Sequence, residues 1–536
     1  MFAHPANTLS SAAVEYEADV LVLGGGPAGT WAAISAAANG AKVILADKGF
    51  CGTSGATAPS GTGVWYVNPD PERRAKAMNS RWDLGGRLAD PAWMRRVLDQ
   101  TYENVNRLAE WGYPFNNDID GRPIRTNLDG PDYMRLMRKR VKSAGVRILD
   151  HSPALELLRD ASGAVAGAAG IRRQKGDTWA VRAGAVVLAT GGCAFLSKAL
   201  GCNVLTGDGH LMAAELGAEF SGMEFSTAYA MALDQGSVTK TRFYEWAEFS
   251  FVDGRPIPGA ASKGGRSIIA KVLETEPVYA RLNADAETQI AMRYSQPNFF
   301  VPLDRRGIDP FRDRFPITLR LEGTVRGTGG VRIAGTDCAT SVPGLYAAGD
   351  AATRELICGA FTGGGSHNAA WAMSSGFWAG AGAAVFSRQH RGRRRAVWRA
   401  GGAGLAEGPD RRIDAQGLIR NVQAEVFPYS RNYRRHGDRL KDSLGRLNAA
   451  WAHASRAAPA ELGEAQRTRE AVAMLAVSRW MYESALVRTE TRGMHKREEY
   501  PQKDEAQRHH IISGGLDEVW TSTTAPHAPM LEVLAA

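Results

Sequence analysis

Three glycines near the amino end, Gly24, Gly26 and Gly29, have the spacing GxGxxG and directly follow an apolar run at residues 20–23. In this spacing the first glycine allows a tight turn, the second lets the backbone approach a pyrophosphate, and the third lets a helix pack closely on a strand. A helix that begins here directs its positive dipole end at phosphate. Asp47 ends the next apolar run, where a carboxylate accepts a hydrogen bond from a ribose hydroxyl. The pattern therefore predicts a dinucleotide site.

The elements that position these residues read as a βαβ unit, with strands at 20–23 and 42–46 and a helix at 30–39. Four later segments fit the same nucleotide-binding domain. They are the β run 185–189 followed by Thr190-Gly191-Gly192, the TGDG stretch 206–209, the strand-and-acid segment 342–350, and GGGSHN at 363–368. Because these segments are far apart in sequence, the domain is predicted to be discontinuous, with an insertion between about residues 224 and 325 that caps the site.

An uncharged stretch at 369–387 has nearly the length of a membrane span, but it contains Gly376, Gly380 and Gly382 and little Leu, Ile or Val. It predicts a buried Gly/Ala-rich helix and no membrane span. Residues 400–409 are typical of a linker, 418–488 have helical patterning with alternating charge, and 489–536 form a polar tail.

Composition indicates a soluble globular protein of several domains, since 44% of the 536 residues are hydrophobic and 23% are charged. The net charge of +9 is a mild bias, and the basic run 388–399 is expected to be a solvated face, not a nucleic-acid site. Five scattered cysteines without a CxxC pair argue against disulfides, a zinc site or an iron–sulfur cluster on this chain and suit a reducing cytoplasm. The amino end lacks the features of a signal peptide, so a cytoplasmic location is expected.

Several motifs in order resemble one family over most of the chain. They are the glycine fingerprint, TSGATAPSGTG at 53–63, LAEWGYPF at 108–115, ATGG at 189–192, TGDG with AAELGAEFSGMEF at 206–225, GLYAAGD at 344–350 and TETRGMHKREEYP at 489–501. The sequence is similar to the fumarate reductase and succinate dehydrogenase flavoproteins, a family that includes aspartate oxidase and the adenylylsulfate reductase flavoprotein subunit. The resemblance implies an α/β fold with a Rossmann-like FAD-binding domain (15–224 and 326–399), an inserted α+β capping domain (225–325), and a C-terminal helical domain with its tail (410–536).

The resemblance also places FAD on matching positions. These expected cofactor-binding residues are Gly24, Gly26, Ala28, Gly29, Asp47, Lys48, Thr53, Ser54, Ala154, Ala189, Thr190, Gly191, Asp208, Gly349, Asp350, Ser366 and Asn368. The helix that starts at Asn368 would lie beside the flavin ring, where its N-terminal dipole stabilises an anionic reduced flavin.

Departures from the family pattern matter for the substrate. Where members that bind FAD covalently have a histidine, this chain has Ser54-Gly55-Ala56, which predicts non-covalent FAD. Tyr229 and Val325 stand where two site histidines are usual, Thr362 or Gly363 replaces a site arginine, and the family's proton-shuttling arginine has no clean match. Losing most of a carboxylate clamp should abolish dicarboxylate recognition. Fumarate, succinate and aspartate are therefore not expected as substrates.

Other residues are candidates for the chemistry. Tyr229 and His367 are candidate acid, base or orienting groups, and Arg266, Lys263 and Arg326 are candidate anion-binding or proton-donating groups, each with a structural role as the alternative. Arg492 and His495 could support the fold or contact substrate. The aromatic segment with Tyr244, Trp246, Phe249 and Phe251 is either cap core or the lining of an apolar pocket.

The first interpretation is an FAD-dependent dehydrogenase or oxidase that acts on a small organic molecule by hydride transfer to flavin N5. The same site run in reverse would be a C=C reductase. The second is a flavoprotein subunit that passes electrons to an iron–sulfur partner, with the basic run as its docking face. A flavoprotein associated with RNA is a third, supported only by charge.

Overall fold

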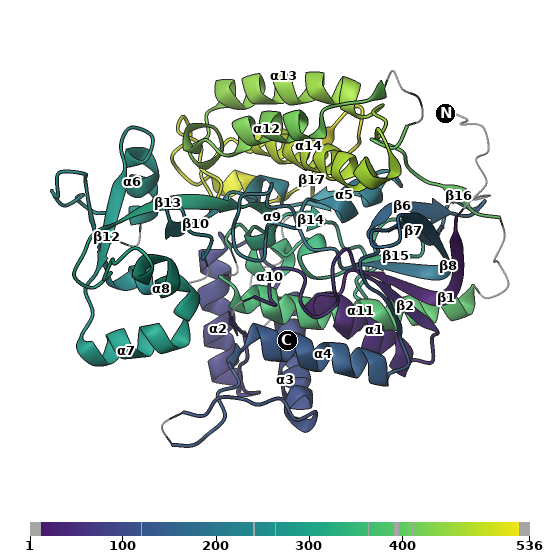
Figure 1. The fold of residues 1–536 in the computed structure, drawn as a ribbon, viewed down its shortest axis with the longest axis horizontal. Helices are drawn as coiled ribbons and strands as arrows, with labels where there is room; N and C mark the ends of the chain where they lie inside the picture. Colours follow the sequence, from purple (N-terminus) through teal and green to yellow (C-terminus); the bar gives the residue numbers. More distant parts are fainter. Residues whose placement is uncertain are drawn as a thin grey trace.

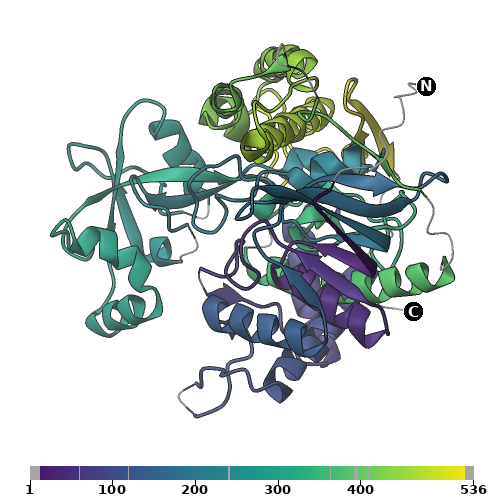
Figure 2. The ribbon, with the colours of Figure 1, turned by 45° about the vertical axis from the view of Figure 1, so that its right-hand side comes forward.

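The computed structural model describes residues 12–59, 61–118, 120–239, 242–262, 264–362, 364–390, 396–406, 408 and 411–524. Three parts are visible in Figure 1: a sheet flanked by helices on the right, a smaller sheet with helices on the left, and a helical layer along the top. Figure 2, turned by 45°, shows the left-hand part projecting from the rest of the molecule.

Eight described strands form the central sheet, in the order β16–β6–β7–β8–β1–β2–β5 with β15 also paired to β8. Strands β1, β2, β5, β8 and β15 pair in parallel, and β6, β7 and β8 form antiparallel pairs. The strands are β1 (Val14–Leu23), β2 (Val43–Ala46), β5 (Arg147–Leu149), β6 (Ala154–Arg159), β7 (Val165–Arg172), β8 (Asp177–Leu188), β15 (Leu345–Ala347) and β16 (Trp398–Arg399). The apolar half of β1 is buried on both faces, as a central parallel strand requires.

Two helices pack on this sheet in close contact with each other. Helix α1 (Pro27–Ala38) and the uncharged helix α11 (Ser366–Gln389) touch through glycines of α11. A Cβ on Gly376 would lie 2.3 Å from the Ala28 carbonyl oxygen, and one on Gly380 would lie 2.1 Å from that of Ala32. The small residues of α11 are thus explained by helix packing. Among the described residues, no helix is long and apolar enough to cross a membrane.

Three further helices lie in the lower part of Figure 1 and pack against α1, α11 and one another: α2 (Pro71–Leu84), α3 (Pro91–Glu110) and α4 (Gly130–Ser143). Each begins with an aspartate whose side chain accepts backbone N–H groups of the first turn, and each has proline within its first two positions. Both features satisfy or remove donors that a helix start leaves unpaired. The short strands β3 (Thr62–Gly63) and β4 (Asn127–Leu128) form an antiparallel pair; β3 comes before α2 in the chain and β4 comes just before α4.

The inserted segment forms the capping domain on the left of Figure 1. Its antiparallel sheet has the order β10–β13–β12–β11, and three helices pack with it. The elements are β10 (Ala228–Leu233), β11 (Ala247–Ser250), β12 (Val278–Leu282), β13 (Phe315–Glu322), α6 (Gly265–Val272), α7 (Ala286–Ser295) and α8 (Pro297–Asp304). An aromatic cluster of Phe243, Phe299, Phe300 and Phe315 forms its core.

The C-terminal part begins with helices α12 (Ala415–Val426), α13 (Gly437–Ala454) and α14 (Ala465–Val487). The chain then returns to the FAD-binding domain as the hairpin β17 (His510–Gly514) and β18 (Trp520–Thr524). Strand β17 pairs with β9 (Phe220–Ser221), which also pairs with β14 (Gly330–Val331). The predicted fold class is confirmed, and within the described part of the predicted polar tail residues 510–524 form a hairpin. Its hairpin is stabilised by pairing with strands distant in sequence.

The basic run 388–399 is only partly described, because residues 391–395 lie outside the described residues. Helix α11 ends at Gln389, and Trp398 and Arg399 form β16 at the edge of the central sheet. Arg399 lies 3.4 Å from the Glu156 carboxylate. This end of the run is therefore part of the sheet edge, and Arg399 itself is exposed.

Candidate functional site

One cavity of about 1960 Å³ extends from the glycine-rich turn after β1 to the junction of the capping domain with the C-terminal part. Its lining includes most of the residues expected to hold FAD: Gly24, Gly26, Ala28, Asp47, Lys48, Ser54, Ala154, Ala189, Thr190, Gly191, Asp208, Gly349, Asp350, Ser366 and Asn368. Gly29 and Thr53 are not in the lining. The exposed Thr53 hydroxyl donates to the Phe50 carbonyl, and Gly29 is part of a helix–strand contact.

The three glycines of the fingerprint differ in what surrounds them. Gly24 has a φ of 108°, and a Cβ there would lie 2.2 Å from the Ala189 carbonyl oxygen. A Cβ on Gly29 would lie 1.8 Å from the Gly24 carbonyl oxygen. A Cβ on Gly26 would meet no atom within 4 Å. Gly24 and Gly29 are thus required by the fold itself, whereas Gly26 borders open space at the start of α1, as a pyrophosphate site requires.

Asp47 and Lys48 organise the next part of the cavity. The Asp47 carboxylate accepts from the backbone N–H groups of Gly25 (2.5 Å) and Gly49 (2.6 Å) and from the Ser54 hydroxyl (2.9 Å). The Lys48 ammonium lies 2.7 Å from Asp208 and 3.1 Å from Glu470. Burial alone would lower the pKa of Lys48, but these two carboxylates outweigh burial and raise it. Lys48 therefore stays cationic beside the expected phosphates. A ribose contact of Asp47 remains a prediction.

The N-terminus of α11 forms the opposite wall of the cavity. The Asn368 amide nitrogen donates to the Val325 carbonyl at 3.2 Å, while its buried Oδ1 atom accepts from none of the described residues. A buried acceptor without a donor costs free energy unless a ligand supplies one. The flavin pyrimidine edge carries such an N–H donor, so the residues present fit FAD. The preceding residue, His367, is absent from the described cavity lining. The centre of its ring lies 4.4 Å from the centre of the Trp65 ring.

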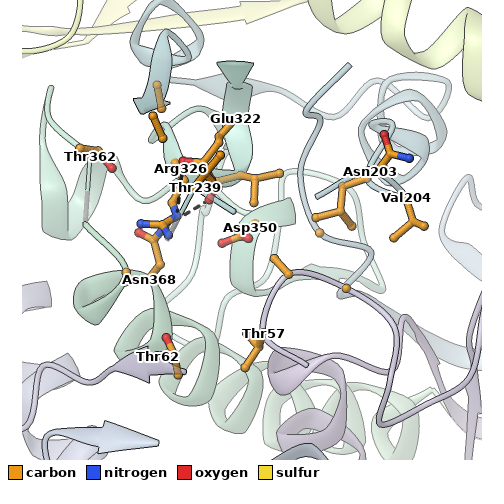
Figure 3. A pocket seen from close by; sticks show the side chains of 18 of the residues that line it. Thr57, Thr62, Asn203, Val204, Thr239, Glu322, Arg326, Asp350, Thr362 and Asn368 are labelled. Atoms are coloured by element: carbon orange, nitrogen blue, oxygen red, sulfur yellow. Dashed lines mark hydrogen bonds and ion pairs between the residues drawn. The ribbon is translucent and has the colours of Figure 1, made fainter. Parts of the chain in front are cut away.

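Arg326 projects into the cavity from the short helix α9 (Gly323–Arg326), as Figure 3 shows. Its Nε atom lies 3.7 Å from the Glu322 carboxylate, which also accepts from the Thr239 hydroxyl at 2.8 Å. A Cβ on Gly365 would lie 3.6 Å from Nη1 of Arg326, so the guanidinium lies beside the start of α11. The guanidinium is held next to the position expected for the flavin.

The other candidates for the chemistry have different surroundings. Tyr229 borders the cavity, but its hydroxyl donates to the carbonyls of Val426 (2.8 Å) and Phe427 (3.2 Å), and burial raises its pKa well above the ordinary value. Arg266 is exposed and lines the cavity from α6. Lys263 lies outside the described residues.

One cavity-lining cation, Lys496, was missed by sequence reasoning. Lys496 lines the cavity and donates to the hydroxyls of Ser267 and Tyr433. Lys496 lies in the C-terminal signature motif, next to His495, so the motif itself was the available signal. The signature's own candidates are structural: Arg492 is ion-paired to Glu490, and His495 is buried with its pKa held far below the usual range by burial and by nearby arginines.

The cap aromatics divide between core and cavity. Tyr244 and Phe249 border the cavity together with Phe243, whereas Trp246 is exposed elsewhere on the cap. The buried Tyr244 hydroxyl has no hydrogen-bond partner among the described residues. Part of the cavity wall at the cap is therefore aromatic, but it does not include Trp246.

Comparison with known proteins places this geometry among characterised flavoproteins. Residues 19–238 match the family described as FAD binding domain, and residues 434–525 match the one described as Fumarate reductase flavoprotein C-term. L-aspartate oxidase of Streptomyces coelicolor is 28% identical over 62% of this chain and 63% of that protein. L-aspartate oxidase of Mycobacterium bovis is 26% identical over 94% of this chain and 96% of its own length.

Solved structures show the same fold. E. coli quinol fumarate reductase matches with a TM-score of 0.79 at 18% identity, covering 96% of this chain and 98% of that one. Adenylylsulfate reductase of Archaeoglobus fulgidus matches with a TM-score of 0.75 at 19% identity, covering 98% and 99%. Both likenesses extend over the FAD-binding, capping and C-terminal parts together.

Proposed function

The chain belongs to the fumarate reductase and succinate dehydrogenase flavoprotein family of FAD-dependent oxidoreductases, and on that premise we propose that it oxidises or reduces a small organic molecule other than fumarate, succinate or aspartate. The observation that carries this proposal is the single cavity that joins the glycine-rich turn to the cap. It provides a place for the cofactor and a separate, chemically different place for a substrate.

The cofactor side of the cavity suits FAD. When bound, FAD accepts or donates a hydride at N5. Gly26 and the start of α1 would hold its pyrophosphate, Lys48 would balance the phosphate charge, and Asp350, Ser366 and Asn368 would border the ribityl chain and the ring. No histidine lines the cavity among the described residues, which supports non-covalent attachment.

The substrate side argues against a dicarboxylate. Val325 and Thr362 are neutral, and the Tyr229 hydroxyl is engaged by two backbone carbonyls. The positions of the family's two site histidines and of its site arginine are thus neutral here, and the cations that do line the cavity, such as Arg326, stand at other positions, so the family's dicarboxylate clamp is missing. Kinetic assays with fumarate, succinate and L-aspartate should therefore show no turnover above background.

Arg326 is the residue we assign to charge stabilisation during the reaction. It is anchored by Glu322, which Thr239 in turn orients, and it lies beside the start of α11. An arginine fixed in this way stabilises negative charge that develops on a substrate and costs no reorganisation when the charge appears. Arg326→Met should lower turnover roughly hundredfold while FAD content stays at the wild-type level.

The test of the proposed function is anaerobic photoreduction of the purified protein followed by admission of air. Reoxidation within seconds supports an oxidase, and peroxide release would then be screened with amines and alcohols. Reoxidation over many minutes supports a dehydrogenase or reductase with another acceptor, including an iron–sulfur partner protein. Acid precipitation should release FAD into the supernatant. A protein without a flavin absorbance band after addition of FAD would contradict the proposal, and FAD that stays in the acid pellet would contradict non-covalent binding.

A further inference from the structure

Some cations on the cap side of the cavity have no carboxylate partner. The cap side is the lining from residues 227–326 together with Tyr433 and Lys496. The cations among its described residues are Arg242, Arg266, Arg326 and Lys496. Arg242 pairs with Glu245 at 3.0 Å, and Arg326 pairs with Glu322. No carboxylate in the described part of the chain lies within ion-pair distance of Arg266 or Lys496. The cap side therefore has two cations without a counter-charge.

Lys496 is held in place by neutral groups. Its ammonium donates to the Ser267 hydroxyl and lies 3.3 Å from the Tyr433 hydroxyl, and these two hydroxyls are 3.3 Å apart. The ammonium also lies 4.7 Å from the centre of the Tyr433 ring. These contacts orient the ammonium without neutralising it. A partly buried cation without a counter-charge is a favourable partner for an anionic ligand.

The three groups come from three parts of the fold. Ser267 is on helix α6 of the cap, Tyr433 ends the π-helical turn Tyr429–Tyr433, and Lys496 is in the loop after α14. The Tyr433 ring also packs edge-on to Tyr229, with ring centres 5.5 Å apart. The position of Lys496 is thus fixed where the cap meets the C-terminal part, and a ligand held there would contact both.

Apolar side chains form part of the remaining cap-side lining, next to polar groups such as Ser295 and Gln296. Phe243, Phe249 and Val325 border the cavity there, together with the buried Tyr244. Lys496 contacts Ser267, the residue that follows Arg266 on α6, so the two cations without a counter-charge come from neighbouring segments. This arrangement suits a ligand with an anionic group next to a partly apolar body.

We infer that Lys496, oriented by Ser267 and Tyr433 and assisted by Arg266, binds the oxyanion group of a substrate whose remaining body is apolar. The inference rests on the proposed function, because it concerns the substrate of that same cavity. Carboxylate, sulfonate and phosphate groups share the required chemistry: each accepts hydrogen bonds from an ammonium and from neighbouring hydroxyls.

The test uses the FAD-loaded protein and three probes: phenylacetate, phenylphosphonate and the neutral phenylacetamide. Dissociation constants are read from perturbation of the flavin absorbance and from calorimetry. At least one anionic probe should bind roughly tenfold to hundredfold more tightly than the amide, because the anion adds charge-assisted hydrogen bonds. Which anion binds more tightly distinguishes a carboxylate substrate from a phosphoryl substrate.

Substitutions of Lys496 and Ser267 test whether these residues bind the anion, and a control substitution detects effects on the protein in general. Lys496→Met should abolish the preference for the anion and leave amide binding unchanged, Lys496→Arg should keep part of it, and Ser267→Ala should weaken it about threefold. Lys271→Met, an exposed change on the same helix α6 and outside the cavity lining, is the matched control. Equal binding of anions and amide by the wild type, or an unchanged preference in Lys496→Met, overturns the inference. FAD content and photoreduction are measured on every variant, so failure of the proposed function would be seen separately as loss of flavin.

Discussion

The fully buried Arg354 guanidinium lies 2.7 Å from the Asp350 carboxylate, four residues earlier on the same loop. The same side chain donates to the carbonyls of Thr324 (2.6 Å) and Val325 (3.1 Å), where the chain returns from the cap. Arg354 therefore connects the expected ribityl-binding acid with the segment that carries Arg326. The cofactor side and the substrate side of the cavity are positioned by one arginine.

Replacing Arg354 tests this connection. Arg354→Met should destabilise the protein by about 3–5 kcal/mol, since it leaves a carboxylate and several carbonyls without their donor in a buried setting. It should also weaken FAD binding. Thermal unfolding and FAD titration check both effects. The control is Arg420→Met, because Arg420 makes only an exposed ion pair with Asp414; a similar loss in both variants would contradict the connecting role.

The glycine fingerprint allows a comparison of two neighbouring substitutions. Gly26→Ala places its methyl group in open space, so folding should change by less than about 1 kcal/mol while FAD binds roughly hundredfold more weakly. Gly29→Ala forces a methyl group against the Gly24 carbonyl and should cost roughly 3 kcal/mol or more. Circular dichroism melts and flavin content measure the two effects. Full FAD content in Gly26→Ala would show that the pyrophosphate does not lie there.

Tyr229 provides a test of a candidate catalytic group. Because its hydroxyl is directed to the carbonyls of Val426 and Phe427, Tyr229→Phe should lower stability by about 1 kcal/mol and change turnover by less than roughly threefold. Val426 retains a second donor, the Asn432 side chain, so no acceptor is left wholly unpaired there. The rate of flavin reduction by the identified substrate is compared between Tyr229→Phe and the wild type. A loss of a hundredfold or more would restore Tyr229 as an acid or base.

Stability should depend on pH through a buried ion pair between β17 and the FAD-binding domain. Burial alone would lower the pKa of His510, but Glu355, 2.6 Å from its Nδ1 atom, outweighs burial and raises the pKa above 6.5. A raised pKa gives stability that is fully present below the unfolded-state value and is lost as pH rises through the folded-state value. Burial alone would raise the pKa of Glu355, but the interactions with His510 and Ser221 outweigh burial and lower the pKa below 4.5. The Glu355 contribution is therefore lost only on acidification.

Urea unfolding between about pH 5 and pH 9 checks this dependence. The free energy of unfolding of the wild type should fall as pH rises above 6.5, and His510→Gln should reduce that slope. Glu224, whose pKa burial raises to about 7, faces the same cluster and contributes a slope of the same sign that the variant retains. His453→Gln, at an exposed position on α13, should leave the slope unchanged. A slope that is equal in wild type and His510→Gln would refute the assignment.

Local sequence patterns predicted the dinucleotide-binding βαβ unit, whereas the FAD-binding residues came from the family resemblance and stay predictions. Gly24, Gly29 and the glycines of α11 are required by contacts between adjacent elements, so their spacing is visible in the sequence. Arg354 gave no comparable signal, and the signature motif around Lys496 did not show that this residue reaches the cavity. Their roles depend on partners from distant segments, such as Ser267 on α6, and no spacing rule links such residues. His367 illustrates the converse, since its neighbour Asn368 reaches the cavity while its own ring packs on Trp65.

The pairing of β17 with β9 has a consequence for biosynthesis. Ser221 in β9 lies opposite Ile512 in β17, so an edge of the FAD-binding domain stays open until most of the chain has left the ribosome. The newly made FAD-binding domain must avoid aggregation while this strand edge is uncovered. β17 can pair with β9 only after helices α12, α13 and α14 have been translated. The cavity wall is likewise completed late, because Glu470 and Lys496 also belong to the last segments to be translated.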